Sequence, residues 1–223
     1  EYLSLFSAEL TDFPAPLFGL SELTTLELSG NRINSLPEKI SGLQNLVRLD
    51  LSENPLFSLP TSFTKFPWLQ ELNLSQTNIA ELPSSIDSLK SLRYLGLNHT
   101  VLRTLPESIG KLESLQYLSL RNTVINRLPE SFGNLSELEV LNMGYSINSE
   151  LPNSFGKMRS LHTLILDHAV IHTLPKSIGK LKSLIHLDLG NSVIHELPES
   201  LGKLRSLQSL ILDNTLITQL PNS

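Results

Sequence analysis

A leucine recurs at every 23rd residue of this chain without interruption. The copies are Leu23, Leu46, Leu69, Leu92, Leu115, Leu138, Leu161, Leu184 and Leu207. A fixed period between about 20 and 50 residues is typical of a solenoid, in which one structural unit stacks repeatedly on itself. Because each unit contacts only its neighbours, such a chain presents a long surface to partners, and its function is sought on that surface.

The first half of each unit has the pattern of a strand. When each unit is numbered from its first leucine, apolar residues occupy positions 1, 4, 6, 11, 14, 18 and 21. Positions 4 and 6, such as Leu49 and Leu51, alternate with the period of two that a strand requires. Identical units are related by translation, so the strands are expected to lie side by side and parallel, about 4.8 Å apart.

The second half of each unit begins with a proline at position 15, from Pro14 to Pro221. Proline has no backbone donor and a fixed φ, so this position must lie outside the central sheet. The segment that follows, P-x-S-[IF]-G-x-L, runs from Pro106 to Leu112 in one copy and has apolar residues three apart. This spacing predicts a short 3-10 or helical turn on the outer side of the coil.

The consensus L-x-x-L-x-L-x-x-[NT]-x-I-x-x-L-P resembles the leucine-rich repeat family over essentially the whole chain. Its 23-residue L-P-x-S-I-G form resembles the intracellular type found in Ras-pathway scaffolds, plant relatives and bacterial effectors. The resemblance implies an α/β solenoid, a right-handed coil with a parallel sheet on its concave face and 3-10 turns on its convex face.

The resemblance also implies that the side-chain amide at position 9, as in Asn31 and Asn54, forms hydrogen bonds with buried backbone groups of the turn. Ala169 lacks one, so its turn should rely on water or neighbouring groups.

The period predicts a single domain over residues 1–223, built from about ten units. Residues 1–22 already follow the pattern in frame, and the last unit stops at Ser223 before it is complete. Solenoids normally need polar capping units over their terminal apolar layers, and none is visible at either end. We therefore expect this chain to be a fragment of a longer protein.

Composition narrows the class of function. The chain is 40% hydrophobic and 17% charged, as in ordinary globular proteins. Its net charge of -5 argues against binding to a nucleic-acid backbone. The absence of Cys excludes disulfides and thiolate sites, and favours the cytoplasm or secretion into a host cytosol. No apolar run approaches the roughly 18–20 residues that membrane insertion needs.

Variable side chains mark the surface where a partner is expected. Positions 3 and 5 flank the inward-pointing leucines, so they should project from the concave face, and they vary from unit to unit. Relaxed constraint on solvent-facing positions would produce the same variation. Tyr94 and Tyr117 stand in adjacent units, and Tyr and Arg are favoured at binding hot spots. The candidate partner-binding residues are Arg48, Asp50, Glu71, Arg93, Tyr94, His99, Tyr117, Val140, Tyr145, His162, Ile165, His186 and Asp188.

Two columns allow alternative interpretations. Position 10 is apolar in six consecutive units, which indicates either an exposed interface stripe or, as we favour, a half-buried column. Its residues are Val101, Val124, Ile147, Val170, Val193 and Leu216. Basic residues recur at positions 20 and 22, where a solvated rim is favoured over a phosphate or lipid site. They are Lys157, Arg159, Lys180, Lys182, Lys203 and Arg205.

One unit departs from the consensus, because Asn148 occupies position 11 where the others have Ile or Leu. The favoured interpretation is a locally shifted turn that brings the preceding Ile147 inward. The alternative is a bend that reshapes a binding surface.

No arrangement of residues predicts catalysis. A phosphate-binding glycine loop, H-E-x-x-H and G-x-S-x-G are all missing, and no nucleophile has a positioned base. His172 and His195 share position 12, but no third metal ligand shares their column. We expect no catalytic residue, metal or cofactor. The function predicted is a non-catalytic module that binds a protein on its concave face, as a monomer rather than an oligomer. Alternatives are the substrate-recruiting part of a larger enzyme, such as a bacterial ubiquitin ligase, or a self-associating scaffold that uses the position-10 column.

Overall fold

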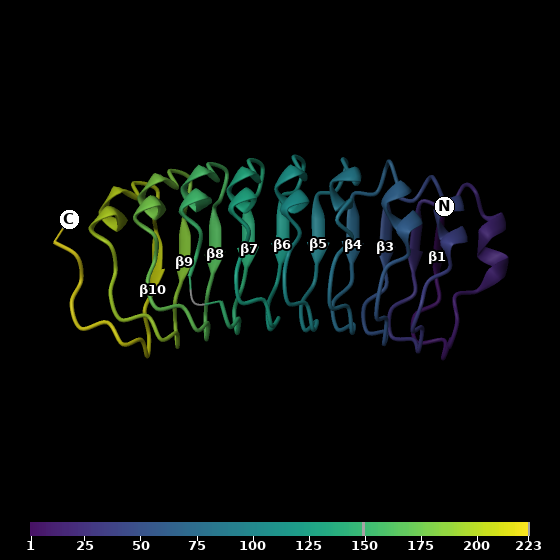
Figure 1. The fold of residues 1–223 in the computed structure, drawn as a ribbon, viewed down its shortest axis with the longest axis horizontal. Helices are drawn as coiled ribbons and strands as arrows, with labels where there is room; N and C mark the ends of the chain where they lie inside the picture. Colours follow the sequence, from purple (N-terminus) through teal and green to yellow (C-terminus); the bar gives the residue numbers. More distant parts are fainter. Residues whose placement is uncertain (149, 223) are drawn as a thin grey trace.

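The sheet runs the length of the molecule in a computed structural model that describes residues 1–148 and 150–222. Within these residues, ten three-residue strands form one parallel sheet in sequence order (Figure 1). Each strand pairs in register with the strand one repeat later, so that Leu49 lies opposite Leu72. The strands are β1 (Tyr2–Ser4), β2 (Thr25–Glu27), β3 (Arg48–Asp50), β4 (Glu71–Asn73), β5 (Tyr94–Gly96), β6 (Tyr117–Ser119), β7 (Val140–Asn142), β8 (Thr163–Ile165), β9 (His186–Asp188) and β10 (Ser209–Ile211).

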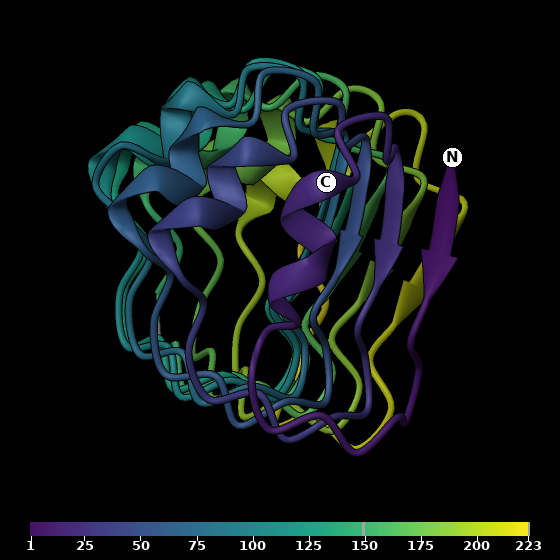
Figure 2. The same cartoon turned by 90° about the vertical axis from the view of Figure 1, so that its right-hand side faces the viewer.

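Short 3-10 helices form the opposite wall of the coil, as the end-on view in Figure 2 shows. All of them except η4 directly follow the position-15 proline, whose fixed φ leads the chain into the helical turn. The predicted placement of the prolines outside the sheet is therefore confirmed. The 3-10 helices are η1 (Ala15–Gly19), η2 (Glu38–Gly42), η3 (Thr61–Lys65), η4 (Ile86–Ser88), η5 (Glu107–Lys111), η6 (Glu130–Asn134), η7 (Asn153–Lys157), η8 (Lys176–Lys180) and η9 (Glu199–Lys203).

Stacked apolar columns fill the space between the two walls. Leu49 and Leu51 are fully buried, as the alternation of positions 4 and 6 predicted. Position 18 adds aromatic side chains, and the buried rings of Phe132 and Phe155 stack with their centroids 6.3 Å apart. Each fully buried side chain of this kind contributes about 1.5–3 kcal/mol of hydrophobic stabilisation.

In the units of Asn31 and Asn54, a buried position-9 side chain holds the turn that follows the strand. The Asn54 amide donates to the carbonyls of Leu28 (2.8 Å), Leu51 (3.1 Å) and Ser52 (3.1 Å), and its oxygen accepts the Ile33 N–H (3.0 Å). The role expected for the position-9 amide is confirmed.

Later units hold the same turn with fewer bonds. The Thr77 hydroxyl donates only to the Leu74 carbonyl, at 2.7 Å. In the unit of Ala169 the residue's own N–H donates to the Leu166 carbonyl, at 3.1 Å. The same backbone bond forms at Ser146 (3.3 Å) and Ser192 (3.2 Å), so it is not particular to the unit of Ala169.

The residue at position 8, at the start of this turn, adopts the left-handed conformation in all ten units. Ser7 in the first unit has a φ of 50°, and the non-glycine residues at position 8 of the other nine units have φ between 54° and 57°. This conformation is uncommon for Tyr, Gln and Glu, so their identities do not reveal it. The residues are Ser7, Gly30, Glu53, Gln76, His99, Asn122, Tyr145, His168, Asn191 and Asn214. His99 and Tyr145 therefore project from turns at the strand ends, not from the strands themselves.

Glycines at position 19 allow close packing of η5 to η8. A Cβ atom placed on Gly133 would lie 2.2 Å from the carbonyl oxygen of Ser154, and one on Gly110 would lie 2.1 Å from that of Ser131. No side chain fits in such a space. These glycines are therefore contact points between successive units.

The structure corrects the interpretation of Asn148. The Asn148 side chain is buried, with 1% of its surface exposed, and Ile147 is 48% exposed, so Ile147 does not turn inward. The backbone keeps its register because the Val170 N–H donates to the Ser146 carbonyl at 2.9 Å. Position 11 therefore points inward even when it is polar, and the Asn148 oxygen accepts the Glu150 N–H at 3.1 Å.

Candidate partner-binding site

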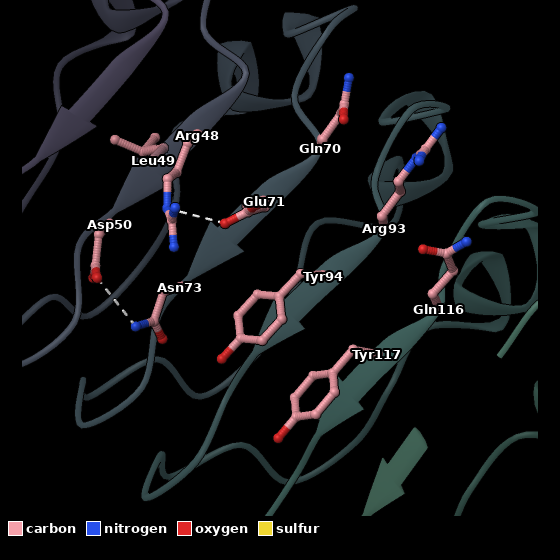
Figure 3. A pocket seen from close by; sticks show the side chains of 10 residues that line it. All are labelled: Arg48, Leu49, Asp50, Gln70, Glu71, Asn73, Arg93, Tyr94, Gln116 and Tyr117. Carbon is pink, nitrogen blue, oxygen red and sulfur yellow. Dashed lines mark hydrogen bonds and ion pairs between the residues drawn. The ribbon is translucent and has the colours of Figure 1, made fainter. Parts of the chain in front are cut away.

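A hollow of about 480 Å³ opens on the concave face between β3 and β6. Figure 3 shows its side chains, most of which come from strand positions 3 and 5 and from the residues before β4, β5 and β6, with Leu49 at position 4 of β3. Six of the predicted candidates lie here together. The lining residues are Arg48, Leu49, Asp50, Gln70, Glu71, Asn73, Arg93, Tyr94, Gln116 and Tyr117, and we call this site the concave hollow.

Two tyrosines form one side of the concave hollow. In-register pairing of β5 with β6 places Tyr94 beside Tyr117, and their rings stack with centroids 4.8 Å apart and an angle of 11° between the planes. Burial raises the pKa of the Tyr94 hydroxyl, and the neighbouring Tyr117, Asp50 and Glu71 raise it further. Tyr94 therefore keeps its proton at neutral pH and can donate a hydrogen bond to a partner.

Small residues at position 5 accompany these two tyrosines. A Cβ atom on Gly96 would lie 3.2 Å from the Tyr94 ring and 2.7 Å from the Asn73 side-chain oxygen. Ser119 is fully buried, and its hydroxyl donates to Asn98. The expectation that every position 5 projects into solvent is therefore wrong in these two units. A larger residue in place of Gly96 would displace the Tyr94 ring.

Charged and polar groups form the opposite side of the concave hollow. The Arg48 Nε atom lies 2.9 Å from a Glu71 carboxylate oxygen. The Asp50 carboxylate accepts the Ser52 N–H at 2.9 Å and an Asn73 amide hydrogen at 3.3 Å. These contacts hold the groups in place before any partner arrives, which lowers the entropy lost on binding.

Tyr145 belongs to a second cluster, at the strand ends. Its ring stacks on His168, with centroids 4.2 Å apart, and the Arg121 guanidinium lies 4.6 Å from the ring centroid. Arg121 also forms a two-pronged ion pair with Asp167, at 2.7 and 3.1 Å. The pair crosses above Gly144, where a Cβ atom would lie 2.2 Å from Asp167 and 2.4 Å from Arg121.

The Asp167 pair predicts a pH-dependent stability. Burial raises the pKa of the Asp167 carboxyl, but hydrogen bonds and charges from Arg121 and His168 outweigh it, so the pKa lies below its ordinary value. A lowered folded-state pKa stabilises the protein above about pH 4 and loses this effect as pH falls. Asp167→Asn should therefore cost about 1 kcal/mol of unfolding free energy at pH 7, and less at low pH.

Urea unfolding at neutral and acidic pH measures this difference. Asp87→Asn is the matched control, because Asp87 pairs with the exposed Lys111 at 3.7 Å and should cost less than about 0.5 kcal/mol. An Asp167→Asn penalty that is equal at both pH values would contradict the assignment.

The remaining candidates lie outside the concave hollow. Val140 on β7 lies beside Tyr117, and the His99 ring lies 2.8 Å from the Asn122 amide. His162 contributes to a separate shallow hollow, and Asp188 accepts the Gly190 N–H at 2.9 Å. Ile165 and His186 are half-buried strand residues in β8 and β9.

Sequence reasoning missed two groups of residues. Gln70, Asn73 and Gln116 line the concave hollow, but they carry no charge or ring that distinguishes them from other surface amides. The second group is Arg121, Asp167 and His168 in the strand-end cluster. Its signal was present at position 7, where Arg121, Gly144 and Asp167 place opposite charges on either side of a residue without a side chain.

The position-10 column is more exposed than the favoured interpretation assumed. Five of its six residues are exposed, and Val193 is partly buried. Position 10 lies outside the turn because positions 9 and 11 on either side point inward. The exposed fractions are 46% for Val101, 41% for Val124, 48% for Ile147, 40% for Val170 and 61% for Leu216.

The residues that the structure describes contain no group of three or more His, Cys, Asp or Glu side chains placed to hold a metal ion. The rings of His172 and His195 lie 6.3 Å apart between centroids and are tilted by 54°. No helix within residues 1–148 and 150–222 has the length and apolar character to cross a membrane.

The stacked units and their continuous exposed sheet define a repeat-protein scaffold of the solenoid class. Family models give the particular family. The model described as "Leucine rich repeat" matches residues 1–56 and 159–217, and the "Leucine-rich repeat region" model matches residues 84–169. The chain belongs to the leucine-rich repeat family. Leucine-rich repeat folds commonly serve as protein-interaction modules.

Solved structures show the same fold. A leucine-rich repeat protein of Leptospira interrogans, LIC12759, is 28% identical with a TM-score of 0.78, covering 98% of this chain and 68% of that one. The plant peptide hormone receptor RGFR1, solved with RGF2, is 29% identical with a TM-score of 0.73, covering 92% and 38%. In the Drosophila Toll–Spatzle complex the identity is 20% and the TM-score 0.77, with 96% and 33% covered, so this likeness concerns the fold alone. This chain thus spans less than half of those two longer chains. Comparison with curated protein sequences finds no significant match.

Proposed function

We propose that this chain is a non-catalytic module that binds a protein partner on its concave face, with Tyr94 and Tyr117 at the centre of the contact. The stacked pair at 4.8 Å carries this proposal. Tyrosine provides a large apolar area with a polar tip, and its two side-chain torsions cost little entropy to fix. Two such rings beside a hollow fit the pattern of a hot spot.

The other candidate residues extend the contact beyond the concave hollow. A stable protein interface buries about 800 Å² on each partner, which exceeds what a single hollow between four strands supplies. Val140 continues the surface from Tyr117, and Ile165, His186 and Asp188 lie on the next strands. The proposed partner therefore follows the sheet across several units and places an anchoring side chain against the tyrosines.

Replacement of the two tyrosines is expected to weaken binding strongly. The double variant Tyr94→Ala/Tyr117→Ala should lower affinity for a partner more than tenfold, because hot-spot truncations cost about 2 kcal/mol or more. Proteins captured on the immobilised wild-type chain are identified, and the affinity of each is then measured for both chains by calorimetry. Tyr2→Ala is the matched control, because Tyr2 is an exposed position-3 tyrosine of β1 outside the concave hollow.

The double variant must be folded for this comparison to count, so its circular dichroism and thermal unfolding are recorded beside those of Tyr2→Ala. A second double variant, Tyr94→Phe/Tyr117→Phe, keeps the rings and removes only the hydroxyl groups. A folded Tyr94→Ala/Tyr117→Ala chain that binds every captured protein as tightly as the wild type does would refute the proposal.

A further inference from the structure

The convex side carries an unusual concentration of positive charge in three successive turns. Residues 156–160, 179–183 and 202–206 read G-K-M-R-S, G-K-L-K-S and G-K-L-R-S, with six basic side chains and no acidic one. We call these segments the basic turns. The whole chain has 17 basic and 22 acidic side chains, so about a third of its cations gather in 15 residues. The basic turns are therefore positively charged on a chain whose net charge is negative.

These six cations form no ion pair within the part of the chain that the structure describes. All six side chains are exposed, and none of them forms an ion pair with a carboxylate in residues 1–148 or 150–222. Lys111, at position 20 of an earlier unit, differs because it pairs with Asp87 at 3.7 Å. Unneutralised neighbouring cations repel one another, so this arrangement costs stability unless an external anion binds there.

A surface hollow lies among these side chains. It measures about 610 Å³ and is lined by Gly156, Lys157, Arg159, Lys180, Lys182 and Ser183. The Lys182 ammonium is held in place, because it donates to the carbonyls of Gly179 at 3.0 Å and Lys203 at 3.1 Å. Its third hydrogen remains available, and the Ser183 hydroxyl offers another donor.

We propose that the basic turns bind a compact ligand that carries two or more phosphate groups. Neighbouring strands lie about 4.8 Å apart and the turns on the convex side are spaced at least as widely, so three of them span at least about 10 Å. One phosphate has a charge of about -2 and cannot neutralise six cations over that length. The arginines offer forked donors that match phosphate oxygens, and the lysines act as point charges.

A long nucleic acid fits this surface less well than a compact ligand does. The basic turns hold no exposed aromatic side chain on which a base could stack. Their length of roughly 10 Å also reaches only a few phosphates of a strand. The same phosphate chemistry occurs in soluble polyphosphates and in phosphorylated lipid headgroups, and the experiment separates these two sources.

Two probes test the proposal on the intact chain. Tripolyphosphate is titrated by calorimetry, and phosphatidylcholine vesicles with and without a phosphatidylinositol bisphosphate are tested by co-sedimentation. The triple variant Lys157→Gln/Arg159→Gln/Lys180→Gln should lose affinity about tenfold or more, because each lost bond to a charged group is substantial. The control Lys65→Gln/Lys111→Gln changes two position-20 lysines in earlier units and should bind like the wild type.

The two binding experiments distinguish the source of the phosphate groups and can contradict the proposal. Binding of tripolyphosphate indicates a soluble ligand, and binding only to the phosphoinositide vesicles indicates a lipid headgroup. Wild-type binding to neither probe, equal binding by the triple variant, or tighter binding of single-stranded RNA would overturn it. None of these results depends on the concave face, since Tyr94→Ala/Tyr117→Ala should leave phosphate binding unchanged.

Discussion

Asn54→Ala should lower the free energy of unfolding by about 3 kcal/mol. The Asn54 side chain makes four hydrogen bonds to buried backbone groups of two adjacent units. Alanine would leave the Leu28 and Leu51 carbonyls and the Ile33 N–H without these partners. Each unsatisfied buried group costs about 1–3 kcal/mol, and entry of water would recover part of this loss.

Thr77→Ala provides the matched comparison, because Thr77 occupies the same position of the next unit and makes one such bond. It should cost about 1 kcal/mol. Urea unfolding of both variants measures the two penalties side by side. If the two substitutions cost the same, position 9 contributes to stability by a route other than the bonds described for Asn54.

Gly133→Ala should cost about 2 kcal/mol, although alanine is normally the better residue in a helical turn. The new methyl group would lie 2.2 Å from the Ser154 carbonyl oxygen, so η6 and η7 would have to separate. Overpacking of a tight contact typically costs about 1–3 kcal/mol.

The control for this substitution is Gly42→Ala, at the end of η2, where a new Cβ atom would meet nothing within 4 Å. Loss of backbone freedom in the unfolded chain should make this variant neutral or more stable by up to about 1 kcal/mol. Thermal unfolding of the two variants should therefore shift in different directions. A stability loss of similar size in both would show that the cause is backbone conformation and not the close contact with Ser154.

The coil could be predicted from sequence because its cause is local and repeated. The leucines at positions 4 and 6 show which side of each strand faces the core. The prolines at position 15 show that the segment they begin cannot be part of the sheet. Because Tyr94 and Tyr117 occupy the same position of adjacent units, their side-by-side arrangement follows from the repeat alone. Even Asn148, whose polarity suggested a shift, follows the register of its neighbours because backbone bonds such as that between Val170 and Ser146 fix it.

Details of the candidate site could not be predicted because they depend on how individual side chains lie. Whether position 5 faces solvent depends on the ring of Tyr94, which lies near Gly96. The left-handed conformation at position 8 is another such detail, because nothing in the identity of Tyr145 or Gln76 indicates it. The partner-binding role of the candidate residues remains a prediction that the tyrosine variants test.

The ion pair between Arg121 and Asp167 has a consequence for how this chain can evolve. Units of a solenoid are readily duplicated or deleted, because each one fits against any similar neighbour. The pair joins residues 46 apart in sequence and skips the unit of Gly144. Gain of one unit between them would move the two charges about 5 Å further apart, and loss of the unit of Gly144 would bring them about 5 Å closer, so either change would disrupt the present two-pronged geometry. Changes in repeat number should therefore accumulate toward the ends of the array, and the segment from Arg121 to Asp167 should keep its length.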